Sequence, residues 1–190
     1  MILEATEKAL ADRRLLDYVG NLAVSLVQKQ IEEGPWVPNA ALTIAVKQGD
    51  KPLRDRGQLL SSITYRAEGP TTIVVGTNHP AAEILHNGGT VRPSRSKALA
   101  IPAGPWVRTL MRGTSPAPRQ MLEQLRGSGW WVWRQKNVVL GQKKGGKKDP
   151  IPLFILRTSV TIPGRPFMRM SNEQVEKILS AVAAWVGGAR

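Results

Sequence analysis

The stretch "SSITYRAEGPTTIVVGT", residues 61–77, decides the fold class of this chain. Its first half alternates between two faces, as a half-buried strand does, with Ile63, Tyr65 and Ala67 on one side. Gly69-Pro70 favours a tight turn, and the β-branched run that follows reads as a second strand. We therefore expect an antiparallel pair of strands near the middle of the chain.

Two amphipathic helices are expected on either side of this pair. Residues 4–32 repeat apolar side chains with a 3.6-residue period, and Gly34-Pro35 ends the pattern. Near the other end, Ser171 and Gln174 form a capping box ahead of an apolar stripe that stops at Gly187-Gly188. The predicted class is α+β: a mostly antiparallel sheet with a long N-terminal helix and a C-terminal helix packed on it.

The segments between these elements predict a few shorter ones. We expect a short helix at 40–47, a helix with Pro80 at its first position, a strand at 98–101 and a helix at 119–126, with the rest of 92–128 irregular. Two β runs, 130–140 and 151–162, flank the sequence "GQKKGGKKDP". This arrangement predicts a protruding basic β-hairpin. No linker divides the chain, so residues 1–190 are predicted to form a single domain.

Charge is unevenly distributed along the chain. It carries 27 Lys and Arg against 14 Asp and Glu, net +13. Residues 1–91 hold nine basic and ten acidic residues, net −1, whereas 92–148 hold thirteen basic residues and only Glu123, net +12. A confined block of this kind indicates a local surface that meets DNA or an acidic partner, although a solvated face that aids solubility is the simpler reading. The candidate contacts are Arg92, Arg95, Lys97, Lys143, Lys144, Lys147 and Lys148.

Both histidines of the chain lie in "HPAAEILH", residues 79–86. A metal site would need His79, Glu83 and His86 on one continuous helix, but Pro80 is best accommodated in the first helical turn and leaves His79 outside. Structural zinc also prefers four ligands, and the chain has no cysteine. An ordinary short helix is therefore the favoured interpretation.

Other features bear on the functional class. The absence of cysteine excludes disulfides and thiol catalysis, and no apolar run has the length of a membrane span. The first residues lack the pattern of a secretory signal, so we expect a soluble protein with no membrane partner, made in a cytoplasm. No phosphate-binding loop, G-x-S-x-G elbow or H-E-x-x-H motif occurs. We expect neither enzymatic activity nor a cofactor.

The sequence "WWVW", residues 130–133, has two open interpretations. Trp130, Trp131 and Trp133 could anchor a subunit interface, because tryptophan is enriched at interface hot spots. Alternatively, alternate rings of a strand could fill the core.

Three further segments carry a resemblance. They are residues 34–65, with Trp36, Pro38, Pro52-Leu53 and Gly57-Gln58-Leu59; residues 74–89, "VVGTNHPAAEILHNGG"; and residues 162–179, with Arg165-Pro166-Phe167 ahead of the final helix. In this order, they are similar to the phage virion morphogenesis, or tail completion, family of tailed bacteriophages. Residues 91–150 match no part of that pattern and look like an insertion or extended arm.

The resemblance implies a non-enzymatic virion part, assembled in the host cytoplasm and placed at the neck, where a filled head joins a tail. It further implies a homo-oligomeric ring, usually of six copies, between a neck or connector protein and a tail terminator or tail tube protein. Arg165 and Phe167 would then fix the approach to the last helix and, with Arg54 and Arg56 on a loop, contribute to a subunit interface. The basic segment would meet an acidic ring or genomic DNA in the channel.

A stand-alone nucleic-acid-binding protein is the alternative. The mixture of basic and aromatic residues in 130–148 favours it, because exposed rings could stack on single-stranded bases. No helix-turn-helix, RRM or zinc-finger pattern accompanies that segment.

Overall fold

The chain folds into two compact units. The computed structural model describes residues 12–113 and 117–188, without the side chains of residues 112 and 113. The chain passes between the units after Val37, Asp50, Gly88 and Ile162, so the second unit comprises 38–50 and 89–162. The predicted α+β class is confirmed. Residues 91–150, which the resemblance leaves unmatched, fall wholly within the second unit.

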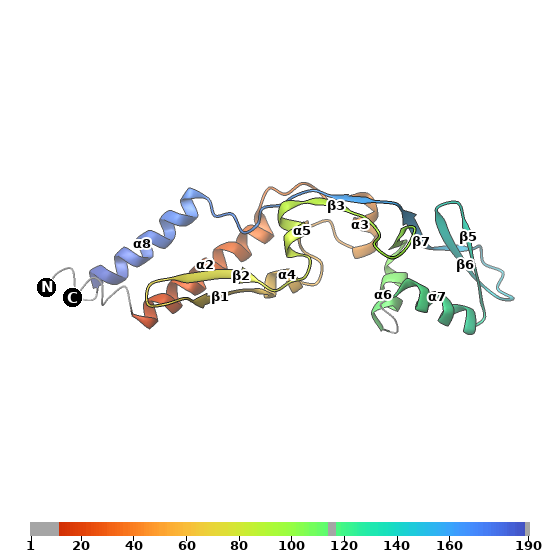
Figure 1. The fold of residues 1–190 in the computed structure, drawn as a ribbon, viewed down its shortest axis with the longest axis horizontal. Coiled ribbons are helices and arrows are strands. Elements are labelled where there is room, and N and C mark those ends of the chain that lie inside the picture. Colours follow the sequence, from red (N-terminus) through yellow and green to blue (C-terminus); the bar gives the residue numbers. More distant parts are fainter. Residues whose placement is uncertain (1–11, 114–116, 189–190) are drawn as a thin grey trace. The chain divides into compact units, whose positions relative to one another are not determined.

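The first unit combines helices with one β-hairpin (Figure 1). Its elements are α2 (Arg13–Glu33), α4 (Gln58–Ser61), β1 (Ile63–Ala67), β2 (Ile73–Thr77), α5 (Ala82–Asn87) and α8 (Asn172–Gly188). The predicted hairpin is confirmed: β1 and β2 pair antiparallel, with Tyr65 opposite Val75. The helix α5 begins at Ala82, two residues later than predicted, because Pro80 lies in a turn before it.

The helix α2 positions the rest of the first unit. The Asp12 carboxylate caps it by accepting a hydrogen bond from the Arg14 amide at 2.9 Å, and the helix ends at Gly34 as predicted. Residues 4–11 of the predicted helix lie outside the described residues. Its buried face contacts the hairpin closely: a Cβ added at Gly20 would lie 2.3 Å from the Tyr65 ring.

The predicted capping box of α8 is confirmed. The Ser171 amide donates to Gln174 Oε1 at 2.8 Å, and the Gln174 amide donates to Ser171 Oγ at 3.3 Å. Trp185 stacks on Tyr18 of α2 with ring centroids 5.9 Å apart. The predicted apolar stripe is only partly covered, since Val175 and Leu179 remain 42% and 61% exposed.

The second unit contains a four-stranded antiparallel sheet of order β4-β7-β6-β5. Its strands are β4 (Leu99–Pro102), β5 (Trp130–Gln135), β6 (Val138–Lys143) and β7 (Ile151–Arg157). A separate pair joins β3 (Gly89–Val91) to β8 (Val160–Ile162), and the helices are α3 (Ala41–Lys47), α6 (Pro105–Gly113) and α7 (Pro118–Gly127). The predicted elements at 40–47, 98–101 and 119–126 are confirmed to within two residues.

The predicted hairpin of 130–140 with 151–162 is wrong in its strand boundaries. Residues 130–140 form all of β5 and the first half of β6, joined by a two-residue turn at Lys136-Asn137. Lys136 adopts a φ of 52°, a conformation usually given to glycine, yet neither glycine nor proline marks this turn in the sequence. The lysine-rich loop therefore connects β6 to β7, and residues 151–162 are divided between β7 and β8.

Each unit has its own hydrophobic core. In the first, one buried cluster consists of Val27, Ile31, Leu59, Ile63 and Phe167. In the second, the buried cluster consists of Val107, Met121, Leu125, Val139, Leu153 and Phe154. Because Val107 belongs to α6 and Met121 and Leu125 to α7, these two helices cover one face of the four-stranded sheet. Among the described residues, no helix is long and apolar enough to cross a membrane.

Candidate interaction surfaces

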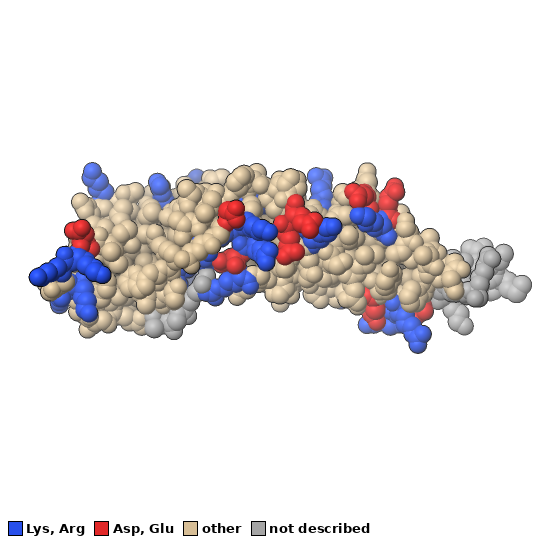
Figure 2. Space-filling view, turned by 180° about the vertical axis from the view of Figure 1, so that it is seen from behind, with Lys and Arg blue, Asp and Glu red and all other residues tan. Residues whose placement is uncertain are grey.

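The division of charge follows the division into units. The segments of the second unit carry 15 basic and three acidic residues, net +12, whereas those of the first carry 12 basic and 11 acidic, net +1. Glu123, one of the three acidic residues, already pairs with Arg119 at 3.2 Å. On the face drawn in Figure 2, basic side chains gather at the end of the second unit that carries β5 and β6. The second unit therefore presents the basic surface.

The predicted basic contacts lie at opposite ends of the four-stranded sheet. Lys143 ends β6. Lys144, Lys147 and Lys148 lie in the loop that leads to Ile151, the first residue of β7. Arg92, Arg95 and Lys97 precede β4, whose Leu99 lies opposite Arg157 at the far end of β7. All seven side chains are exposed, but the register shows that they form two groups and not one site.

Two further basic residues, which no sequence pattern indicated, join the second of these groups. Lys136 lies at the β5–β6 turn, which is at the same end of the sheet as Leu99, and Arg157 ends β7 there. Both side chains are exposed. Their positions could be assigned only once the 136–137 turn was known, because that turn decides which end of the sheet Lys136 occupies.

The three tryptophans of "WWVW" divide between the two predicted roles. Trp130 packs on the core and stacks on Trp106, with ring centroids 5.6 Å apart. Trp131 and Trp133 point to the opposite face of the sheet and are 60% and 36% exposed. The Lys144 ammonium lies 4.8 Å from the centroid of the Trp131 ring, a cation–π contact. Alternation along β5 therefore leaves two of the three rings available to a partner.

In the first unit, the two predicted loop residues are exposed. Arg54 forms an ion pair with Glu32 at 3.5 Å, and Arg56 follows on the same loop. Half-exposed pairs of this kind contribute at most about 1 kcal/mol to stability. Both side chains remain accessible to a neighbouring molecule.

Arg165 and Phe167 lie inside the first unit, where they are only 5% and 0% exposed. The Arg165 guanidinium donates to the Val37 carbonyl from Nε at 3.0 Å and from Nη2 at 2.8 Å. Its backbone amide donates to the Leu85 carbonyl at 3.0 Å. Burial lowers the pKa of Arg165 from its ordinary value. These side chains hold the segment before α8 in place and, being buried, present no surface to a neighbouring subunit.

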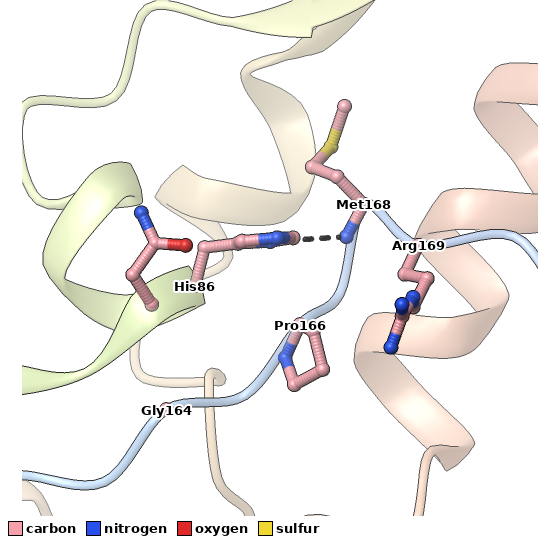
Figure 3. Close-up of a pocket in the computed structure, with 6 residues that line it drawn as sticks. His86, Gly164, Pro166, Met168 and Arg169 are labelled. Atoms are coloured by element: carbon pink, nitrogen blue, oxygen red, sulfur yellow. Dashed lines mark hydrogen bonds between the residues drawn. The ribbon is translucent and has the colours of Figure 1, made fainter.

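Both histidines accept a hydrogen bond from a backbone amide, His79 from a residue close in sequence and His86 from one far along the chain. His79 Nδ1 accepts from the Ala81 amide at 3.2 Å, and His86 Nδ1 accepts from the Met168 amide at 3.4 Å (Figure 3). The His86 ring also meets Phe167 edge-on, with centroids 5.3 Å apart. Within residues 12–113 and 117–188, no group of three or more His, Asp or Glu side chains is placed to hold a metal ion.

A shallow pocket of about 560 Å³ opens beside His86. Its lining residues are His86, Asn87, Gly164, Pro166, Met168 and Arg169. Figure 3 shows that they come from the end of α5 and from the extended segment that precedes α8. The pocket therefore lies where these two segments of the first unit meet.

Comparison of the chain with protein-family models, with curated proteins and with solved structures gives no match.

Proposed function

We propose that this chain is a structural subunit of a phage neck or tail, a ring-forming tail completion or head–tail joining protein. It acts by binding its neighbours and not as an enzyme. Its partners are further copies of itself, an adjacent neck or connector protein, and a tail terminator or tail tube protein. It belongs to the virion and is assembled in the host cytoplasm.

One observation carries this proposal: the three segments on which the family resemblance rests meet in one core. Leu59 and Ile63 from the first segment pack in the same cluster as Phe167 from the third. The backbone amide of Arg165 bonds to Leu85 of the second segment, and its side chain bonds to Val37 of the first. The resembling residues of the three segments therefore pack together and are joined by hydrogen bonds.

The two units have different roles in this proposal. The first unit, nearly neutral and containing most of the resembling residues, is the common scaffold. The second unit, net +12, is the part through which this protein meets an acidic ring or genomic DNA. The resemblance implies six copies around the axis.

Electron microscopy of virions tests the proposal. Disruption of the gene should give DNA-filled heads beside detached, full-length tails, and a plasmid copy should restore joined particles. Normal joined virions from the disrupted gene would refute the assembly role.

A stand-alone nucleic-acid-binding protein is a second candidate, favoured by the exposed Trp131 and Trp133 on a unit of net +12. Tight binding of an oligonucleotide by the isolated monomer, falling steeply with salt, would support it. Weak binding by a protein that forms rings would favour the assembly subunit.

A further inference from the structure

We infer that the free edge of β5 is a docking site for an extended acidic segment of a partner protein, which adds a fifth strand to the sheet. The inference rests on the proposed function for the identity of the partner, a neighbouring neck or tail protein. The mode of contact and the chemistry of the partner rest on the geometry and charge of the second unit.

The strand β5 lies at the end of the sheet. It pairs with β6 along all six residues without a register shift, and no strand of the described chain pairs with its other side. Proteins usually protect such an edge with proline, lysine, a bulge or a short strand. The sequence "WWVWRQ" has none of these, and its single charged residue is Arg134. An unprotected edge of this length favours pairing with another chain.

The hydrogen-bond pattern shows which backbone groups are available there. The Lys144 amide donates to the Gly129 carbonyl at 2.8 Å. Because bonded positions alternate along an antiparallel pair, the backbone groups of Trp131 and Trp133 point toward β6. Those of Trp130, Val132 and Arg134 then point toward the free edge, where an added strand would meet them.

Side chains beside this edge supply anchors. Trp131 and Trp133 lie on the sheet face opposite α6 and α7, roughly 7 Å apart along the strand. An added strand would place its own outward side chains next to these rings. Exposed tryptophans in such positions are frequent hot spots of protein interfaces.

Charge selects the partner. Lys143 and Lys144 lie at one end of β5, and Arg134 and Lys136 lie at the other. An acidic strand gains attraction at both ends, whereas the same edge of a second copy would bring one unit of net +12 against another. A nucleic acid cannot complete a backbone ladder, because it has no series of amide and carbonyl groups to pair with those of β5.

The test uses the full-length protein and a synthetic peptide of about eight residues in which Glu alternates with Val or Thr. Tryptophan fluorescence measures affinity, and amide hydrogen exchange followed by NMR locates the contact. We expect slowed exchange at the amides of Trp130, Val132 and Arg134, every second residue. The same peptide with Lys in place of Glu should bind at least about tenfold more weakly.

A matched pair of variants isolates the backbone contact. Arg134→Pro removes an edge amide, and Arg134→Gln removes the same charge but keeps the amide. The proline variant should bind the acidic peptide about tenfold more weakly than the glutamine variant, with circular dichroism of both unchanged. Should the proline variant fail to fold, Trp131→Ser with Trp133→Ser serves instead and should lower affinity by a similar factor.

Three results would overturn the inference. One is equal binding by Arg134→Pro and Arg134→Gln; another is an oligothymidylate that binds more tightly than the acidic peptide. The third is concentration-dependent self-association in the ultracentrifuge that protects the same three amides, which would make a second copy the occupant. None of these results involves virions, so they are separate from the test of the assembly role.

Discussion

At the scale of single residues, Gly164 lies where two backbones of the first unit touch. A Cβ added there would be 2.7 Å from the Asn87 carbonyl oxygen, which cannot move as a flexible side chain could. Gly164→Ala should therefore lower the free energy of unfolding by about 1–3 kcal/mol. Urea denaturation measures the loss. The control is Gly76→Ala, in the same unit but with nothing within 4 Å of the added carbon, which should be nearly neutral.

Arg165 is a buried charge that donates two hydrogen bonds to a backbone carbonyl. Arg165→Met leaves the Val37 oxygen without its two donors and should cost about 2–4 kcal/mol of unfolding free energy. Arg165→Lys keeps the charge but loses the two-donor fork, so we expect a smaller loss. The exposed neighbour Arg169→Met is the control, and a loss there as large as at Arg165 would contradict the argument.

Because of Tyr65, the free energy of unfolding should vary with pH in the alkaline range. Burial raises its pKa above the ordinary value of 10.0, and the hydrogen bond from its hydroxyl to Asp17 at 3.1 Å acts in the same direction. Because the folded state holds this proton more tightly than the unfolded one, the stabilisation is complete below pH 10.0 and is lost as pH rises through the folded pKa. Thermal melts of Tyr65→Phe should show a smaller decline above that pH than wild type; parallel declines would refute this.

At the scale of elements, β5 shows a division between its two faces. Trp130 packs on the core of the second unit and Trp131 does not. Trp130→Ala should therefore cost about 3–5 kcal/mol, and Trp131→Ala less than about 1 kcal/mol. Chemical denaturation followed by circular dichroism compares them. Equal losses would mean that both rings contribute to the core.

Elements with strong local signals were predictable from sequence. The helices α2 and α8 have long apolar periods with capping or breaking residues, and β1–β2 has alternation around Gly69-Pro70. The helix α6 was missed because prolines and glycines suggested irregular structure, although Pro105 occupies its first position, where proline is favourable. The turn at Lys136 was missed because it contains no glycine, although Lys136 has a positive φ.

The candidate site was predictable in composition but not in arrangement. The basic block was visible in the sequence, yet only strand register separates Lys143 to Lys148 from Arg92 to Lys97. Likewise, no pattern in the sequence revealed that Arg165 and Phe167 would be buried. Both facts depend on contacts between segments far apart in the chain, which local periodicity does not encode.

At the scale of the whole molecule, the second unit should dominate binding to polyanions. Replacing Lys143, Lys144, Lys147 and Lys148 together by Gln should lower the salt concentration at which the protein elutes from a cation-exchange column. Replacing Arg13, Lys29, Arg66 and Lys177 by Gln removes the same charge from residues that pair with carboxylates, and should shift elution less. Equal shifts would show that net charge alone governs retention.

The order in which the chain crosses between the units sets the order in which they can fold on the ribosome. When Ile162 has been synthesised, every segment of the second unit exists, but the first unit still lacks Arg165 and Phe167. Its core stays open, with α2 and the β1–β2 hairpin already made and their apolar faces uncovered. Released chains truncated after residue 162 would thus carry a complete basic unit beside an unfinished one, whose exposed leucines a chaperone would recognise.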